Sequence, residues 1–438
     1  MKTALLINPW IYDFAAYDLW LQPWGLMKLA SVLQREGYTV QLLDLMDRHH
    51  PLLPDKALIR SNGTGPYQRC ELPKPSVLAT QSRRWNRFGM PLELFQHALP
   101  EVRPDIILIT SGMTYWYPGV FDLIAMLRQR WPGVSVILGG TYATLMPEHA
   151  STSGADLVIG NGELERLSVE LNLSRSYGHQ ELLEELLCND FHPHAPYAVL
   201  KLSHGCPYRC DYCAQQLLAP EFIQRSCESA LAELEQLTAG RIRHFAFYDD
   251  ALLYDRDYLH NFLEEVMRLE LPLQFHTPNG LHARLLDQDT AHLLRHAGFV
   301  RPVLSLETAQ DTDWHSKVTV PELEAAIGCL RRAGYEAGAY MVYLLLGAPG
   351  CDEESLTRSI DLVHLWGARI SLSEFSPIPG TVLGERFSAA MAEPLLQNNT
   401  IFPVVAPELI PVMQRLKNRV KQLNSKFVFP TQPHTASR

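Results

Sequence analysis

The chain has 438 residues, of which 47% are hydrophobic and 20% are charged, and its formal net charge is −10 at pH 7. This composition is typical of a folded globular protein and argues against both a disordered chain and a membrane protein. The acidic balance disfavours non-specific binding of nucleic acid by the whole molecule. The length predicts two or three domains, and eight cysteines are too few for a disulfide scaffold, so we expect a cytoplasmic protein.

Five apolar runs in the first part of the chain predict buried strands. Helix-compatible segments at residues 23–35 and 118–130 lie between some of them, and continuous Ile, Leu and Val runs indicate strands covered on both faces. The first run is too short for a signal peptide. The pattern therefore predicts a doubly wound, Rossmann-like α/β domain over residues 1–165. The expected strands are residues 4–8, 38–44, 105–110, 134–139 and 156–159.

A basic insertion at about residues 48–90 interrupts this pattern. It carries eight Lys or Arg residues against two acidic ones, with Tyr67, Trp85 and Phe88 among or beside the charges. Such a segment suits nucleic acid, through phosphate contacts and stacking, or a lid over an anionic cofactor or substrate. We favour the lid because the whole chain is acidic, so nucleic acid is not an expected partner.

A second pattern begins after residues 166–195, which predict a polar linker. Six strand–helix units follow and predict a partial (βα)6 TIM-like barrel over residues 196–385, in which ligands bind at the carboxyl ends of the strands. We expect residues 386–438 to form a helical tail that packs against the barrel or its mouth. The expected barrel strands lie near residues 197–203, 243–248, 272–277, 301–307, 338–346 and 368–376. The expected helices lie at residues 228–237, 256–269, 287–296, 321–333, 353–366 and 407–424.

The most informative motif is a loop with three cysteines, Cys206, Cys210 and Cys213. Gly205 and Pro207 exclude a helix there, and the apolar run before them predicts a strand. Thiolates suit zinc or an iron–sulfur cluster, and both commonly take four protein ligands. Three thiols leave one iron of a four-iron cluster open to a small molecule, whereas zinc would need a fourth ligand from elsewhere.

The spacing C-x3-C-x2-C resembles the signature of the radical S-adenosylmethionine (SAM) superfamily, and the resemblance covers about residues 197–380. It implies a 4Fe–4S cluster held by Cys206, Cys210 and Cys213, with SAM bound to the open iron. An electron from the cluster would then cleave SAM to a 5′-deoxyadenosyl radical. The resemblance also implies an electron donor of the flavodoxin or ferredoxin type.

Further motifs after the expected barrel strands resemble the SAM-binding segments of this family, in the same order. A carboxylate pair after the second strand matches the segment that receives the SAM amino group, although Asp249 and Asp250 also suit a helix cap and a turn. Glu307 and His276 are candidates for acid–base work by position alone. The implied SAM-binding residues are Tyr212, Tyr248, Asp249, Asp250, Ser305, Glu307, Gly347 and Pro349.

The first half resembles the cobalamin (B12)-binding domain of one large radical SAM subgroup. Ser and Gly residues after the third and fourth strands match the segments that pass the nucleotide tail of the cofactor. The D-x-H-x-x-G motif that gives cobalt an axial histidine is absent, because the run from Asp47 to Leu52 lacks its glycine. The domain therefore either binds cobalamin without that ligand or serves only for packing. The implied cobalamin-binding residues are Asn8, Pro9, Pro23, Gly25, Ser111, Met113, Gly139, Gly140, Thr141, Gly162 and Glu163.

The resemblance implies transfer of a methyl group from methylcobalamin to an unactivated carbon of a small-molecule substrate. One SAM would remethylate cobalamin, and a second would give the radical that abstracts hydrogen. Two alternatives stay open: radical rearrangement or another modification of a small metabolite, and a non-catalytic cobalamin- or metal-binding protein with a degenerate barrel. The methylthiotransferase subgroup carries three more N-terminal cysteines, whereas this half has only Cys70 and Cys188.

Overall fold

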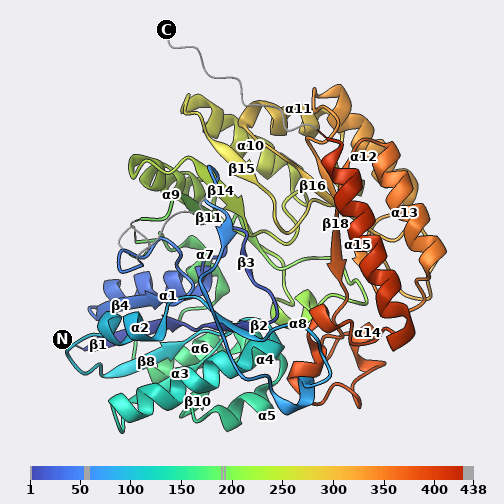
Figure 1. Ribbon diagram of the computed structural model, residues 1–438. Helices are drawn as coiled ribbons and strands as arrows, with labels where there is room; N and C mark the ends of the chain where they lie inside the picture. The colour runs from blue at the N-terminus through green and yellow to red at the C-terminus, as the bar shows by residue number, and fades with distance from the viewer. Residues whose placement is uncertain (1, 54–59, 189–190, 192–193, 428–438) are drawn as a thin grey trace. The chain divides into compact units, whose positions relative to one another are not determined.

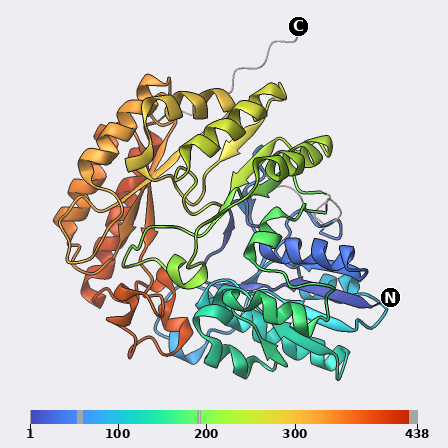
Figure 2. The same ribbon diagram turned by 180° about the vertical axis from the view of Figure 1, so that it is seen from behind.

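The structure is a computed structural model that describes residues 2–53, 60–188, 191 and 194–427. The chain divides into two compact units, and we describe each by itself. Figure 1 shows the elements in chain order, and Figure 2 shows them from behind. Unit 1 comprises Met1–Pro207, Tyr212–Asp250 and Ser376–Pro403. Unit 2 comprises Tyr208–Asp211, Ala251–Phe375 and Val404–Arg438.

The first part of unit 1 contains a five-stranded parallel sheet in the order β10-β9-β8-β1-β4. All five predicted strands are present, and the predicted doubly wound domain is confirmed. The chain adds strands on one side of β1 and then on the other, so β1 and β8 flank the point where the order reverses. The strands are β1 (Thr3–Asn8), β4 (Thr39–Asp44), β8 (Ile106–Ile109), β9 (Ser135–Leu138) and β10 (Leu157–Val158).

Both faces of this sheet are covered by helices (Figure 1). Leu5 and Ile7 of β1 join one apolar cluster, whereas Ala4 and Leu6 join another on the opposite face. Successive side chains of a strand alternate between faces, so the continuous apolar run of β1 supplies two cores. The helices of this part are α1 (Trp24–Arg35), α2 (Leu92–Ala98), α3 (Tyr117–Arg130), α4 (Thr141–Leu145), α5 (Pro147–Ala150), α6 (Leu164–Glu170) and α7 (His179–Glu184).

The basic insertion packs in unit 1 as short antiparallel strands. Its strand β7 pairs with β2 on one side and with β6 on the other. Arg83 and Arg87 lie over the rings of Phe14 and Trp10, at 5.9 and 5.4 Å from the ring centroids. Part of its positive charge is therefore used in contacts with the first domain. The short strands are β2 (Ile11–Asp13), β3 (Tyr17–Asp18), β5 (Gly65–Pro66), β6 (Arg69–Glu71) and β7 (Asn86–Phe88).

All six strand–helix units of the predicted barrel are present in chain order. In unit 1, β11 pairs in parallel with β14, and β12 pairs antiparallel with β13 next to the cysteine loop. In unit 2, β16, β17 and β18 form a parallel sheet. The strands are β11 (Tyr197–Leu200), β12 (Ser203–His204), β13 (Ile223–Gln224), β14 (His244–Phe247), β15 (Gln274–His276), β16 (Val303–Glu307), β17 (Met341–Leu346) and β18 (Arg369–Glu374). The helices are α8 (Gln215–Leu218), α9 (Cys227–Ala239), α10 (Arg256–Arg268), α11 (Gln288–Ala297), α12 (Val320–Arg332) and α13 (Glu353–Leu365).

The C-terminal region divides between the two units. Helix α15 (Ile410–Ser425) packs in unit 2, where Asn424 exchanges two hydrogen bonds with the backbone of Ile370 in β18. Residues 376–403, which include α14 (Val382–Glu385), belong to unit 1 instead. The expected packing of the whole tail on the barrel therefore holds for α15 only. The domain limits at residues 165, 195 and 385 stay a prediction. No helix in the described part of the chain is long and apolar enough to cross a membrane.

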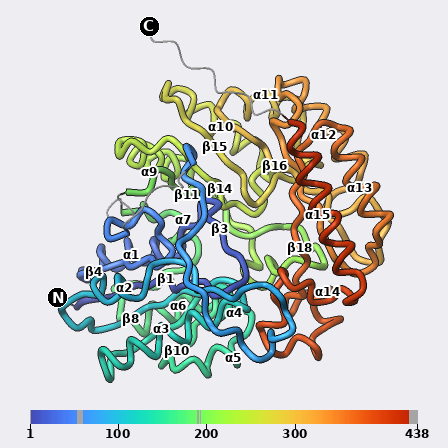
Figure 3. The backbone as a smooth tube through the Cα atoms, viewed as in Figure 1, coloured from blue at the N-terminus to red at the C-terminus, as the bar shows by residue number. Residues whose placement is uncertain are grey.

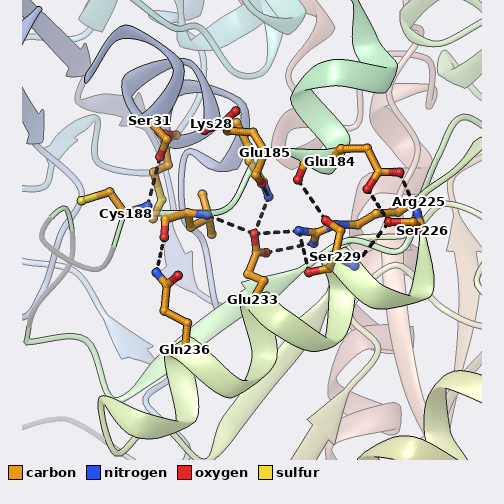
Figure 4. A network of polar contacts seen from close by, with 12 residues as sticks. Lys28, Ser31, Glu184, Glu185, Cys188, Arg225, Ser226, Ser229, Glu233 and Gln236 are labelled. Carbon is orange, nitrogen blue, oxygen red and sulfur yellow. Dashed lines mark hydrogen bonds and ion pairs between the residues drawn. The ribbon is translucent and has the colours of Figure 1, made fainter. Parts of the chain in front are cut away.

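A buried charge network ties α1 to α9 within unit 1 (Figure 4). The carboxylate of Glu233 accepts hydrogen bonds from Lys28, from Arg225 and from the backbone amide of Leu187, and the side chains of the three charged residues are fully buried. Lys28 also donates to the backbone carbonyl of Glu185. Burial lowers the pKa of Lys28 to about 8, against the opposing effect of Glu233. The carboxylate of Glu233 thus binds two cations and one backbone amide of the linker, that of Leu187.

We expect the Glu233→Gln substitution to lower the free energy of unfolding by about 3–5 kcal/mol, because it leaves two buried cations without their counter-charge. Urea titration of the purified protein measures this change. The Lys28→Met variant keeps the Glu233–Arg225 pair and should lose less. Equal losses for the two variants would contradict this account of the network.

Candidate functional site

The carboxyl ends of β1, β8 and β9 meet at one edge of the unit 1 sheet, where the strand order reverses. Ligands of open α/β sheets bind in the crevice at such an edge. Asn8 and Pro9 follow β1, Ser111 and Met113 follow β8, and the Gly139–Thr141 segment follows β9. The structure thus brings together most of the residues that we expected to bind cobalamin, and their contacts with the cofactor stay a prediction.

Ser111 and the glycine pair form a close backbone approach. The hydroxyl of Ser111 donates to the carbonyl of Gly139 at 2.6 Å, and its own carbonyl accepts from the amide of Thr141 at 2.9 Å. Gly140 has a φ of +93°, and a Cβ there would lie 2.5 Å from the Ser111 carbonyl oxygen. Only glycine fits this position without a backbone shift. A flat or extended ligand can therefore pass close to this part of the main chain.

The other expected cobalamin residues surround the same edge or its end. Pro23 precedes α1, and a Cβ on Gly25 or Gly162 would meet no atom within 4 Å. Met113 is 47% exposed. Glu163 is already engaged, since it accepts hydrogen bonds from Gly160 and Arg166 at 2.8 Å. Open space and an exposed apolar side chain at this edge fit a bulky ligand such as cobalamin.

A cavity of about 520 Å³ lies between α4 and the end of β10. Ala143 and Thr144 of α4 form one wall, and Val158 of β10 with Gly160 forms another. This volume falls in the range of small-molecule pockets. Glu163, one of the expected cobalamin residues, also lines this cavity.

Asp44 lies at the carboxyl end of β4 and accepts a hydrogen bond from the side-chain amide of Asn8 at 2.6 Å. Burial raises its pKa from 3.8 to about 8, and the charge of Asp47 acts in the same direction. The carboxyl group therefore keeps its proton at neutral pH. An uncharged acid beside Asn8 keeps this edge free of a negative charge.

The cysteine loop begins with a turn that requires glycine. Gly205 has a φ of +87°, and a Cβ there would lie 2.1 Å from the carbonyl oxygen of Glu221. Cys206 is buried, Cys210 is half-buried and Cys213 is exposed. Cys206 and Cys213 fall in unit 1 and Cys210 in unit 2. The carbonyl of Cys206 accepts a hydrogen bond from Gln216 at 2.6 Å.

Asp249 holds the start of this loop. Its carboxylate accepts hydrogen bonds from the backbone amides of Leu202 and Ser203 and from the Ser203 hydroxyl, at 2.6–3.1 Å. Burial raises its pKa to about 6 although these donors oppose the shift. The side chain that we expected at the SAM amino group thus has a positioning role in the structure. Asp250 has different partners, because it accepts from Gln215 at 2.8 Å and lies 3.8 Å from Lys201.

Two aromatic residues complete the expected SAM set in unit 1. Tyr248 donates to the carbonyl of Trp20 and accepts from the amide of Gln22 at 3.1 Å. Its hydroxyl therefore anchors the segment before α1. Tyr212 is half-buried next to Cys213. The expected contacts of Tyr248 and Tyr212 with SAM stay a prediction.

The remaining expected SAM residues follow strands of unit 2. Glu307 ends β16 at a register shift and has a φ of +65°. This left-handed backbone conformation costs of order 1–3 kcal/mol in a non-glycine residue. The Glu307 carboxylate accepts from Ser316 at 3.2 Å. Gly347 forms the turn after β17, and the Pro349 carbonyl accepts from the Trp314 indole at 3.0 Å. Strain held at a strand end is typical of functional sites.

The sequence analysis missed His282 and Tyr208. The His282 ring is 1% exposed, and neither nitrogen has a hydrogen-bond partner among the described residues. Burial lowers its pKa to about 3, helped by Lys317 and Arg284, so the ring is neutral. Its neighbour Leu281 pairs with Leu304, which places His282 beside Ser305, whose hydroxyl also lacks a partner within the described part. The only sequence signal was a lone polar residue between Leu281 and Ala283.

Tyr208 lies between Cys206 and Cys210 in sequence, and its ring packs against the ring of His282. The two ring centroids are 4.6 Å apart, and Arg284 lies 5.1 Å from the Tyr208 centroid. These contacts lie wholly in unit 2 and support the middle of the cysteine loop. Unpartnered polar atoms nearby suit a small polar ligand such as SAM.

Two protein families match this chain. The radical SAM superfamily matches residues 200–363, and the B12 binding domain matches residues 88–168. The chain therefore carries a B12 binding domain followed by a radical SAM domain. The prediction of this family, with a cobalamin-type domain before the radical SAM domain, is confirmed.

These domains identify a 4Fe–4S cluster, SAM and cobalamin as the cofactors of this radical SAM protein. The described residues contain no ready group of three or more His, Cys, Asp or Glu side chains that could hold a metal ion. The fit of the cluster therefore rests on the soft thiol donors and on the turn that presents them. Cys206, Cys210 and Cys213 would hold it.

Curated relatives of this radical SAM protein are distant. The ribosomal protein uS12 methylthiotransferase RimO of a Synechococcus species is 26% identical over 210 residues, which are 43% of this chain and 42% of that protein. The anaerobic magnesium-protoporphyrin IX monomethyl ester cyclase of Rubrivivax gelatinosus is 20% identical over 361 residues, which are 77% of this chain and 64% of that protein. The chain thus spans less than two thirds of either relative.

A solved structure shares the fold over most of the chain. It is the radical S-adenosylmethionine methyltransferase TsrM from Kitasatospora setae, with a tryptophan substrate and a SAM analogue bound. The TM-score is 0.62 at 17% sequence identity, and the match covers 90% of this chain and 77% of TsrM. At this identity the likeness shows the fold alone.

We expect Gly205→Ala to reduce the iron bound after anaerobic reconstitution by about tenfold or more, because the new Cβ forces the cysteine loop to move. Iron and sulfide analysis of the repurified protein measures the loss. The Gly328→Ala variant is the matched control, since its Cβ would meet only the end of the flexible Arg332 side chain in α12. Equal iron in both variants would show that the turn does not set the thiols.

We expect the Asp44→Asn variant to gain stability relative to the natural chain as pH rises from about 4 to about 8. Asp44 ionises near 3.8 when unfolded but near 8 when folded, so the folded state binds the extra proton in this window and loses stability with rising pH. Urea titration of both proteins across this range gives the difference in unfolding free energy. A difference that does not change with pH would contradict the raised pKa.

Proposed function

We propose that this chain is a cobalamin-dependent radical SAM methyltransferase that acts on an unactivated carbon of a small molecule. The observation that carries the proposal is the B12 binding domain placed directly before a radical SAM domain in one chain. The shared fold with TsrM, which is described as a radical SAM methyltransferase, supports it. When bound, the cluster supplies the electron that cleaves SAM, and cobalamin supplies the methyl group.

The chain's own residues contribute position, shielding and hydrogen bonds. Asp249 fixes the strand end before the cysteine loop, and Gly205 turns the chain into the loop. The Ser111–Gly140 contact opens the main chain of the sheet edge to the corrin cofactor. Neutral His282 offers one donor and one acceptor without a charge that would attract water.

A second candidate function is modification of a ring or skeleton without methyl transfer. The observation that favours it is the match to the magnesium-protoporphyrin cyclase, which extends over 77% of this chain. Methylthio transfer, as named for RimO, is less well supported, because the first half has only Cys70 and Cys188 outside the signature loop. Cys188 lies in the linker, where its amide donates to Ser31 at 3.0 Å.

The partners that we propose follow from the same chemistry. A flavodoxin- or ferredoxin-type donor would deliver single electrons to the cluster, and the substrate would be a small molecule. We also propose a cytoplasmic location, where thiols and a reduced cluster persist. Nucleic acid is not proposed, since part of the basic insertion packs on the first domain.

We expect the reconstituted protein, incubated anaerobically with a reductant and SAM carrying a labelled methyl group, to form 5′-deoxyadenosine. Cobalamin in the protein should acquire the label, and mass spectrometry detects both products. In the Cys210→Ala variant, 5′-deoxyadenosine should fall below detection, because the cluster loses a ligand.

The matched control is Cys329→Ala, which changes a buried thiol outside the loop. This variant should keep 5′-deoxyadenosine formation. Persistent formation in Cys210→Ala would refute the cluster assignment. Deoxyadenosine without any labelled cobalamin or labelled product would favour the second candidate function.

A further inference from the structure

A short segment after the barrel region packs against the first domain inside unit 1. We call residues 394–400 the C-terminal strap. Figure 3 shows the backbone of this orange segment beside the blue insertion, and Arg83 of the insertion donates to the carbonyl of Thr400 at 3.4 Å. Gln397 and Asn398 of the strap are fully buried, although both are polar. Fully buried amides persist only where their hydrogen bonds are made.

Asn398 reaches the strand that follows β1. Its side-chain amide donates to the carboxylate of Asp13 at 2.9 Å, and the other oxygen of Asp13 accepts from the indole of Trp116 at 2.8 Å. The Trp116 ring in turn covers Gly112, where a Cβ would lie only 2.7 Å from the ring. A chain of three contacts thus runs from the strap to the loop between Ser111 and Met113.

Gln397 reaches the same loop from its other end. Its side chain is hydrogen-bonded to the hydroxyl of Thr114, the residue after Met113. The amide nitrogen of Gln397 donates to the Met391 carbonyl at 2.9 Å, and its backbone carbonyl accepts from Ser376 at 2.6 Å. Hydrogen bonds to Met391 and Ser376 therefore fix Gln397, and Gln397 in turn holds the side chain of Thr114.

The strap also contacts the helices that flank this loop. Glu393, directly before the strap, accepts a hydrogen bond from Tyr117 at the start of α3 at 3.1 Å. The Gln397 amide lies 3.4 Å from the sulfur of Met146 after α4. Contacts thus reach the segments after β1, β8 and β9, which are the three that form the ligand edge of the sheet.

We propose that the C-terminal strap sets the cobalamin edge of the first domain, with Asn398 and Thr114 as positioning residues for cobalamin. This inference rests on the proposed function, because it needs cobalamin at that edge. It assigns a role to a segment that follows the barrel and that carries no signature of cofactor binding. The loop with Ser111 and Met113 then has its binding conformation only when the strap is in place.

The test is the affinity of the full-length protein for hydroxocobalamin, measured by equilibrium dialysis. Thr114→Val and Asn398→Leu remove the hydrogen bonds and keep the number and branching of the side-chain heavy atoms. We expect each to weaken binding about tenfold, whereas Thr114→Ser, which keeps the hydroxyl, should stay near the natural affinity. The absorption spectrum of the bound cofactor gives a second readout of its surroundings.

Tyr340→Phe is the matched control for stability. It removes a hydrogen bond of 2.7 Å to the Trp366 carbonyl in unit 2, outside the strap and the loop that the strap contacts. We expect it to lower the melting temperature as the strap variants do, with unchanged hydroxocobalamin affinity. Natural affinity in both Thr114→Val and Asn398→Leu would overturn this inference alone. A natural protein that binds no hydroxocobalamin would overturn the proposed function together with it.

Discussion

Glu233 is the constraint on which unit 1 depends. A carboxylate without any exposure is tolerated only when cations and amides surround it, and here the partners come from three separate segments. Lys28 belongs to the first helix of the cobalamin-type domain, Arg225 follows β13, and Leu187 lies in the linker. Because the buried charge of Glu233 needs all of these partners, the network fixes α9 of the barrel region against α1 of the first domain.

The two candidate edges use different chemistry. At the unit 1 sheet edge, Gly140 leaves the main chain accessible because it has no side chain, and burial keeps the carboxyl group of Asp44 neutral. At the strand ends of unit 2, Ser305 and His282 keep polar atoms without partners among the described residues. The first arrangement suits a large ligand held by shape and backbone contacts. The second suits a small polar ligand that supplies the missing hydrogen bonds.

The strands were predictable because burial on both faces leaves an unbroken apolar run, as in β1. The cysteine loop was also predictable, because the spacing of its three cysteines along the chain is enough to indicate a cluster site. The hydrogen bonds of Asp249 were not predictable, since nothing local reveals that this carboxylate turns back to Ser203, 46 residues earlier. The sequence analysis did not identify His282 or the strap for the same reason. Their importance comes from neighbours that only the folded sheet provides.

The pairing of Asp13 with Asn398 joins residues that lie 385 positions apart. During synthesis at about 5–20 residues per second, Asp13 emerges from the ribosome roughly 20–80 s before its partner. The hydrogen bond between the strap and the first domain can therefore form only after the whole barrel region has been translated. Under the role that we propose for the strap, cobalamin meets its final surroundings only once the catalytic half of the chain exists.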